Sequence, residues 1–256
     1  MSRTRIAPTP SGYLHAGNLY NFLLTQRVAR TFDLELFLRI DDLDAFRLRE
    51  EYVVDIFRCL HWLGIEWIGQ PQNLDDYRTL ADRPGRIDHY FDRLETMIDA
   101  GLPAFVCACS RRDLSRDARC ERGCADRDLK LVPGKTAVRV RLPQSGPGSS
   151  MGDVIVWRRE DLPAYQLQSL IDDDEMHITH IVRGEDLLES THVQLFLSQY
   201  LEGTTFRSVR FLHHGLVTAP NGSKLSKSQG TDLLELTSEL LTDLRDMVED
   251  TALDFD

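Results

Sequence analysis

The sequence predicts an α/β fold with a parallel sheet, and two stretches near its start carry this prediction. Residues 5–7 are typical of a short buried strand, which Pro8 and Pro10 end because proline lacks the N–H that a central strand donates. After the turn at Ser11 and Gly12, apolar residues follow helical spacing from Leu14 to about residue 30. The mostly apolar run 34–40 then suits a second, parallel strand.

The first turn of this helix is a candidate anion site. His15, Gly17 and Asn18 fall there, where free N–H groups and the positive end of the helix dipole favour phosphate. Gly17 leaves room for a ring or phosphate near the backbone, and His15 and Asn18 face the same side. The alternative interpretation is a helix start whose His caps a neighbouring carbonyl.

The remaining elements follow from the same periodicities. Helices are expected over 52–60, 87–100, 163–173, 187–200 and 232–248, and strands over 135–142, 153–159, 178–186 and 209–217. Asp42 or Asp44 is expected to cap the first of these helices, and Asp232 with Glu235 to form a capping box on the last.

A second polar stretch lies at residues 221–228, Asn-Gly-Ser-Lys-Leu-Ser-Lys-Ser. Its glycine turn precedes Lys224 and Lys227, which are three apart among small hydroxyl residues. This composition suits a mobile loop that closes cations over a polyphosphate.

Together, residues 15–18 and 224–228 resemble the HIGH and KMSKS signatures of class I aminoacyl-tRNA synthetases, in the family's order and separation. The resemblance implies a Rossmann-like catalytic domain with helices on both faces of its sheet, and the use of ATP and Mg²⁺. It places ATP binding on His15, Gly17, Asn18, Lys224, Ser226 and Lys227, with the catalytic contacts from His15, Asn18, Lys224 and Lys227.

Residues 39–44, Arg-Ile-Asp-Asp-Leu-Asp, are similar to the Arg-Ile-Glu-Asp-Thr-Asp segment of the glutamyl branch of this family. Asp41 stands where that branch has the Glu that holds the substrate α-amino group, and glutaminyl enzymes carry Asp there. Tyr165 and Arg183 match the glutamyl amino-acid pocket, in which an arginine binds a carboxylate in a bidentate manner. The implied glutamate site consists of Arg5, Ala7, Thr9, Asp41, Tyr165 and Arg183.

Four of the five cysteines form the pattern Cys-x-Cys-x10-Cys-x3-Cys at Cys107, Cys109, Cys120 and Cys124. Two close pairs can converge on one tetrahedral Zn²⁺ ion, whereas the alternative is a loop of reduced, unliganded thiols. Cys59 stands alone in an apolar helix and is expected in the core.

The closest resemblance is to the stand-alone catalytic paralogues of the glutamyl branch, the glutamyl-queuosine tRNA(Asp) synthetases, whose zinc motif has Tyr where Cys120 stands. It implies the first half of the catalytic domain at 1–104, an inserted zinc module at 105–160, the second half at 161–230, an acidic C-terminal helix at 231–256, and no anticodon-binding domain.

Charge is unevenly distributed along the chain, whose net charge is −11. Residues 105–160 carry twelve bases and seven acids, and residues 231–256 carry nine acids and one Arg. The basic insert is the expected contact for RNA, although ordinary scatter of surface charge is the alternative. The sequence lacks an apolar run of 18 residues and a signal peptide, so we expect a cytoplasmic monomer with no membrane partner.

The implied reaction is the ATP-dependent formation of glutamyl adenylate, followed by transfer to queuosine in tRNA(Asp). Two alternatives stay open: an adenylate-forming glutamate ligase with a small-molecule or protein acceptor, and a synthetase-like binding module without catalysis.

Overall fold

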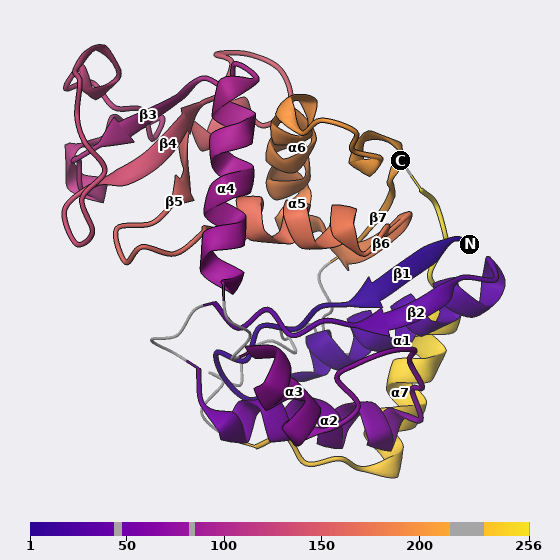
Figure 1. Cartoon of the computed structure of the whole chain (residues 1–256). Helices are drawn as coiled ribbons and strands as arrows, with labels where there is room; N and C mark the ends of the chain where they lie inside the picture. The colour runs from indigo at the N-terminus through magenta and orange to yellow at the C-terminus, as the bar shows by residue number, and fades with distance from the viewer. Residues whose placement is uncertain (44–47, 82–84, 216–232, 256) are drawn as a thin grey trace. The chain divides into compact units, whose positions relative to one another are not determined.

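The computed structural model describes residues 1–43, 48–81, 85–215 and 233–255 (Figure 1). The chain divides into two compact units. The first consists of Met1–Arg83, Ile178–Asp186 and Ser208–Asp256, and the second of Pro84–His177 and Leu187–Arg207. The domain boundaries at 104, 160 and 230 stay a prediction.

The first unit is built on parallel strand pairs. Strand β1 (Arg3–Ile6) pairs with β2 (Glu35–Leu38), with Ile6 opposite Leu38, and β6 (His180–Gly184) pairs with β7 (Arg210–His214). The Thr179 N–H donates to the Arg3 carbonyl at 2.9 Å, which shows that the start of β6 lies beside the start of β1. The predicted parallel α/β architecture is therefore confirmed.

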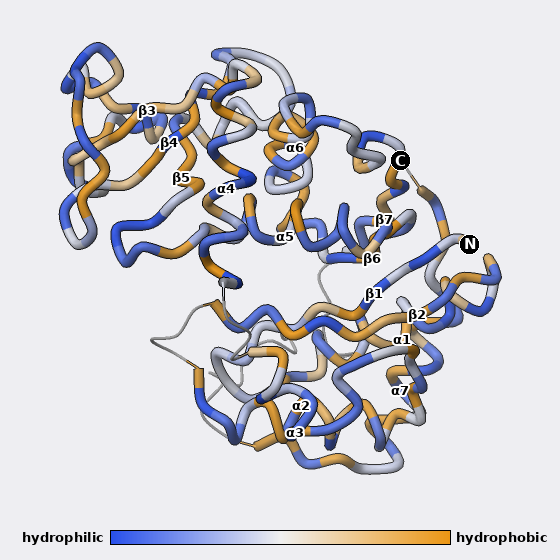
Figure 2. The backbone as a smooth tube through the Cα atoms, in the orientation of Figure 1, coloured by the Kyte–Doolittle hydropathy of each residue, from blue (hydrophilic) through white to orange (hydrophobic). Residues whose placement is uncertain are grey.

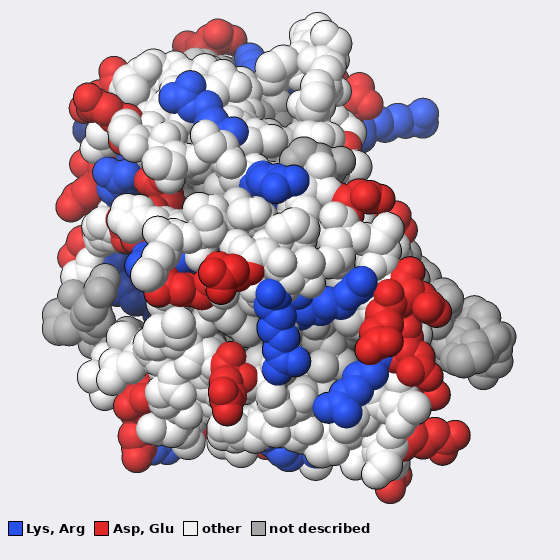
Figure 3. Space-filling model, turned by 90° about the vertical axis from the view of Figure 1, so that its right-hand side faces the viewer, with Lys and Arg blue, Asp and Glu red and all other residues white. Residues whose placement is uncertain are grey.

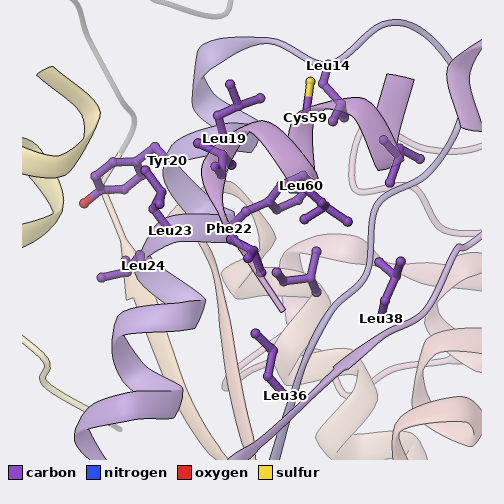
Figure 4. Close-up of a cluster of buried hydrophobic side chains, with 14 of the residues drawn as sticks. Leu14, Leu19, Tyr20, Phe22, Leu23, Leu24, Leu36, Leu38, Cys59 and Leu60 are labelled. Carbon is purple, nitrogen blue, oxygen red and sulfur yellow. The ribbon is translucent and has the colours of Figure 1, made fainter. Parts of the chain in front are cut away.

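Four α-helices complete the described part of the first unit: the first packs on the strands, the second and the last pack on the first, and the third packs on the second. They are α1 (Ala16–Thr31), α2 (Glu50–Leu63), α3 (Leu74–Ala81) and α7 (Ser238–Glu249). Figure 2 shows hydrophobic and hydrophilic residues alternating in short runs along α2, as an amphipathic helix requires. Figure 4 shows Leu19 and Phe22 of α1 gathered with Leu60 of α2 and Leu36 and Leu38 of β2.

The core prediction for Cys59 is confirmed, since its side chain is fully buried in this cluster. Removing such apolar surface from water is the main source of the free energy that holds α1, α2 and β2 together.

The C-terminal helix begins later than its apolar spacing predicts. Residues 233–237 are not helical, and α7 starts at Ser238 because the Thr237 hydroxyl accepts the Leu240 N–H at 3.1 Å. The predicted start at 232 and the capping box with Glu235 are therefore wrong. Leu244 and Val248 are its buried residues, whereas Leu233 is 55% exposed.

The second unit combines three antiparallel strands with helices. Strands β3 (Ala104–Cys107), β4 (Ala137–Arg141) and β5 (Asp153–Trp157) form a meander in which β4 is central. Helices α4 (Arg86–Asp99), α5 (Tyr165–Glu175) and α6 (Leu188–Leu197) belong to the same unit. The strands predicted around 135–142 and 153–159 are thereby confirmed. Among the described residues, no helix has the length and apolar character needed to cross a bilayer.

Candidate active site and cysteine cluster

The turn between β1 and α1 holds His15 in a fixed position. His15 is the N-cap of α1, and its ring Nδ1 accepts the Gly17 N–H at 3.1 Å. In return, the Asn18 side-chain oxygen accepts the His15 N–H at 3.0 Å. This reciprocal capping box satisfies two backbone donors at the start of the helix.

The capping box also sets which side-chain atoms can act as donors. Because Nδ1 of His15 is an acceptor, the proton of the neutral ring resides on Nε2. Burial lowers the pKa of His15, which keeps this neutral form dominant at pH 7. Neither His15 Nε2 nor the Asn18 side-chain NH₂ takes part in the box, so both can donate to an anion near the helix start.

Gly17 is required by the position of the His15 ring. A Cβ atom at residue 17 would lie 3.0 Å from both Cε1 and Nδ1 of His15. Any side chain there would therefore push the ring away from the backbone N–H that it accepts, so the short motif acts as one geometric unit.

The segment after β2 continues the ladder with the segment after β1. The Arg39 N–H donates to the Ile6 carbonyl at 2.9 Å, and the Asp41 N–H donates to the Pro8 carbonyl at 3.0 Å. These bonds place Asp41 beside the end of β1, at the edge of the sheet where open α/β folds bind ligands.

Asp42 caps no helix, because α2 begins at Glu50 with Arg49 at its N-cap; Asp44 lies outside the described residues.

Asp41 is paired with Arg39. Arg39 Nε and Nη2 donate to the two Asp41 oxygens at 2.6 and 3.2 Å, and both side chains are buried. A bidentate pair of this kind is a strong charge-assisted contact. The carboxylate that the resemblance assigns to a substrate ammonium group is thus already neutralised within its own strand segment.

Two other predicted glutamate ligands lie on neighbouring strands of the first unit. Arg5 of β1 and Arg183 of β6 are both buried, and the Arg183 guanidinium lies 4.8 Å from the ring centre of Phe211 on β7. Buried guanidinium groups are costly unless they meet acceptors, so these two favour an anionic ligand or an internal partner. At the end of β1, Ala7 is half-buried and Thr9 is exposed.

The other predicted ligands lie outside the described part of the first unit. Tyr165 is the first residue of α5 in the second unit and is half-buried. Lys224, Ser226 and Lys227 lie outside the described residues. Their assignment to the glutamate and ATP sites stays a prediction.

The four cysteines of the second unit converge as their spacing predicts. Their Sγ atoms all lie within 4.8 Å of one another, and all four residues are buried. Cys109 Sγ lies 3.6 Å from Cys120 Sγ and 3.7 Å from Cys124 Sγ. Tetrahedral zinc with Zn–S bonds of about 2.3 Å requires sulfur–sulfur distances of about 3.8 Å, so the donor set fits Zn²⁺.

Burial shows why two of these thiols need a cation, whereas at Cys120 it is outweighed by hydrogen bonds that lower the pKa. Burial raises the pKa of Cys107 and of Cys109, so the thiolate forms that bind zinc are disfavoured until a positive charge offsets the cost. The Cys109 N–H points at Cys107 Sγ at 3.4 Å, an arrangement that stabilises a thiolate.

The basic residues beside this cluster are largely engaged by the protein itself. Asp153 accepts the Cys120 N–H at 2.8 Å and lies 3.4 Å from Arg141 and 3.7 Å from Arg119. Arg122 pairs with Asp113 at 2.6 Å. These arginines therefore stabilise the fold of the insert, and their positive charge is already partly offset by Asp153 and Asp113 before any RNA binds.

Sequence reasoning missed two acid–base contacts in the first unit. One is the Arg39 partner of Asp41. The other is the contact of Asp55, an acidic residue on the buried side of α2, whose carboxylate accepts the Leu14 N–H at 2.9 Å. An acid directly before Ile56 and Phe57, inside an otherwise apolar helical pattern, was the available signal.

One known protein family matches most of this chain. The family model described as tRNA synthetases class I (E and Q), catalytic domain, matches residues 1–132 and 135–246. The chain belongs to this class I synthetase family.

Relatives of this class I synthetase carry two names. A glutamyl-Q tRNA(Asp) synthetase of Parasynechococcus marenigrum is 38% identical over 93% of this chain and 78% of its own length, and one of Pseudomonas syringae pv. syringae is 37% identical over 88% and 76%. A glutamate–tRNA ligase of Natranaerobius thermophilus is 31% identical over 90% of this chain and 52% of its own length. The chain thus spans about half the length of that ligase.

Solved structures agree on the fold of the synthetase. The glutamate–tRNA synthetase of Elizabethkingia anophelis matches with a TM-score of 0.69 and 23% identity, covering 90% of this chain and 53% of that protein. At this identity the match supports the class I fold alone.

Proposed function

We propose that this class I synthetase activates glutamate with ATP and transfers the glutamyl group to an acceptor on tRNA. In the first step, an oxygen of the glutamate α-carboxylate bonds to the α-phosphorus of ATP as the bond to pyrophosphate breaks. In the second, an acceptor hydroxyl attacks the glutamyl carbonyl carbon, loses its proton, and AMP leaves. The acceptor in this proposal is queuosine of tRNA(Asp).

One observation carries the first step: the capping box uses His15 Nδ1 and the Asn18 side-chain oxygen as acceptors and so leaves His15 Nε2–H and the Asn18 NH₂ group available as donors at the start of α1. Attack on a phosphate needs no protein nucleophile, so catalysis consists of positioning and stabilisation of charge on the phosphate oxygens. Lys224 and Lys227 are proposed to supply further positive charge, and a bound Mg²⁺ would offset negative charge on the phosphate oxygens.

The choice of glutamate rests on buried positive charge at the sheet. Arg183, next to Phe211, is the proposed ligand of the glutamate side-chain carboxylate, and Arg5 is a second cation on the adjacent strand. With Asp41 held by Arg39, the α-amino contact proposed for Asp41 requires the ammonium group to share this carboxylate.

The acceptor rests on the relatives named glutamyl-Q tRNA(Asp) synthetase and on the basic insert. Positive charge is concentrated in the insert, where Arg119 and Arg122 already pair with Asp153 and Asp113, whereas residues 231–256 carry nine acids and one Arg, so the number of phosphates that the protein neutralises should be small. RNA binding should therefore be weak and only shallowly dependent on salt.

Pyrophosphate exchange with each amino acid, with and without RNA, tests this function. We expect exchange with glutamate alone and no requirement for RNA. Labelled glutamate should then attach to total tRNA and also to tRNA lacking its terminal adenosine. Loss of labelling on the truncated tRNA would indicate ordinary 3′-aminoacylation, and absence of glutamate-dependent exchange would refute the proposal.

A glutamate ligase with a small-molecule acceptor is the second candidate. It is favoured by the internal ion pairs that occupy Arg119 and Arg122. Adenylate formation without labelling of any RNA would be its signature.

A further inference from the structure

Asp55 is a buried carboxylate that has a role outside its own helix. It is 2% exposed, and its Oδ1 accepts from Arg58 Nε at 2.9 Å and from Nη2 at 2.7 Å. Its other oxygen, Oδ2, accepts the backbone N–H of Leu14 at 2.9 Å, across 41 residues of sequence. A charge at this depth is tolerated because both oxygens have partners.

The Leu14 contact lies directly before the proposed catalytic motif. Leu14 precedes the N-cap His15, so its N–H lies outside the hydrogen bonds of α1, and the Asp55 carboxylate is its acceptor. The capping box fixes the orientation of the His15 ring relative to α1. The bond between Asp55 and the Leu14 N–H fixes the position of the backbone directly before His15.

The same anchor extends to a second segment. Arg58 Nη2 donates to the Leu234 carbonyl at 3.1 Å, and Leu234 lies six residues after Ser228 in the sequence. One ion pair on α2 thus holds backbone next to His15 and backbone shortly after the lysine motif. Both contacts belong to the first unit.

We propose that Asp55 is a positioning residue for adenylate formation: it holds the Leu14 N–H so that His15 faces the phosphate in the transition state, and Arg58 extends this anchor to Leu234. This inference rests on the proposed function. Asp55 itself contacts neither ATP nor glutamate; it acts through the backbone before His15.

A matched pair of substitutions separates positioning from charge. Asp55→Ala and Asp55→Asn both remove the carboxylate charge and the ion pair with Arg58, but only Asn keeps an oxygen that can accept the Leu14 N–H. We expect Asp55→Ala to lower kcat of glutamate-dependent pyrophosphate exchange about 10- to 100-fold, as misplacement by about 1 Å does, with KM for ATP changed by less than about threefold. Asp55→Asn should restore most of kcat.

The double variant Asp55→Leu/Arg58→Leu tests whether the loss of kcat is caused only by a loss of stability. Replacing a buried ion pair with apolar residues of similar size often preserves the fold, whereas the Leu14 N–H still lacks its acceptor. This variant should melt near the temperature of the parent and yet show the same loss of kcat as Asp55→Ala. A kcat close to that of the parent in Asp55→Ala or in the double variant would overturn the inference. Equal losses of kcat in Asp55→Ala and Asp55→Asn would also overturn it.

Amide hydrogen exchange gives a readout that does not need activity. In Asp55→Ala, the amide of Leu14 should exchange at least about tenfold faster than in Asp55→Asn, while core amides of α1 stay protected. Equal exchange in the two variants would contradict the proposed anchor. If the parent shows no glutamate-dependent exchange of pyrophosphate, the proposed function fails, and the amide measurement still decides whether Asp55 holds Leu14.

Discussion

His15 illustrates how one side chain is oriented entirely by its neighbours in sequence. Its Nδ1 accepts the Gly17 N–H and its own backbone N–H donates to the Asn18 side chain, so Nε2–H is the ring donor that the capping box does not use. A preorganised donor of this kind stabilises developing charge without reorganising during the reaction. The absence of a side chain at Gly17 is what permits the arrangement.

We predict that His15→Ala slows adenylate formation about 10²- to 10³-fold, the usual cost of removing one charge-stabilising donor, or about 3–4 kcal/mol. Glutamate binding should change little, because the donor acts on phosphate. Single-turnover adenylate formation measures the effect. His61→Ala is the control, since His61 is exposed on α2 and its ring stacks on Trp67. A rate for His15→Ala within threefold of the parent would contradict the assignment.

Arg39 and Asp41 show a limit of motif matching at the residue scale. Two residues apart and both buried, they form a bidentate ion pair. Asp41 has a shorter side chain than the Glu of the family, and Arg39 can therefore hold its carboxylate close to their own segment of the chain. Sequence spacing does not predict this ion pair, because the pair depends on the side-chain rotamers that are selected when both residues are buried.

At the scale of elements, the loop between β3 and β4 is organised by its cysteines. This connection has little regular structure, only short turns such as the single helical turn Cys124–Asp126, and its apolar cluster consists of the four cysteines with Phe105, Leu114 and Leu129 against them. So small a core supplies limited hydrophobic free energy, and a bound ion would supply the rest.

We predict one zinc ion per chain, bound by Cys107, Cys109, Cys120 and Cys124. Removal by a chelator should disorder the 105–160 region while the first unit persists, because metal-binding energy here is folding energy. Elemental analysis and proteolysis before and after chelation measure this. Cys59→Ala is the matched control and should retain the zinc, since Cys59 lies in the core of the other unit. Metal-free protein purified without chelator, with four freely alkylated thiols, would refute the prediction.

At the scale of the whole molecule, charge is mixed rather than segregated on the face drawn in Figure 3, where Lys and Arg side chains lie among Asp and Glu. The net charge of −11 adds a general repulsion of phosphate. The proposed recognition of RNA would therefore depend on local contacts of the insert, in keeping with the shallow salt dependence expected above.

Two buried histidines, His180 and His214, and the half-buried His15 make stability depend on pH. Burial lowers the pKa of His15, His180 and His214 below the ordinary value, and Arg210 adds to the effect at His180. At His214, Nδ1 lies 2.8 Å from the Gly215 carbonyl and Nε2 lies 3.0 Å from the Asn21 amide nitrogen. With Nδ1 as donor, Nε2 must accept from Asn21, which only a neutral ring can do.

We predict that the free energy of unfolding falls as pH drops below about 6.5, the ordinary histidine pKa. In that range the unfolded chain binds protons that the folded chain refuses, so acid favours unfolding. Urea titrations at pH 7.5 and 5.5 measure the difference. His180→Phe should reduce it, whereas His177→Asn, at an exposed position with φ of 54°, should leave it unchanged. Equal stability at both pH values would contradict this account.

Local spacing was sufficient for much of this protein. Apolar periodicity predicted most of the strands and helices, though not α3 or β3, and the spacing of Cys107, Cys109, Cys120 and Cys124 predicted their convergence. The short motif at residues 15–18 predicted a polar helix start, because capping and turn chemistry involve residues a few positions apart. The sequence by itself thus determined most of the elements, the thiol cluster and the family of the fold.

The tertiary structure alone decided how buried polar groups are paired. The Asp55–Leu14 bond spans 41 residues and the Asp153–Cys120 bond spans 33. The start of α7 at Ser238 likewise follows the Thr237 cap and its packing against the core, not the longer leucine spacing. A buried donor or acceptor must find a partner among whatever elements pack beside it, and sequence spacing carries no information about which elements those are.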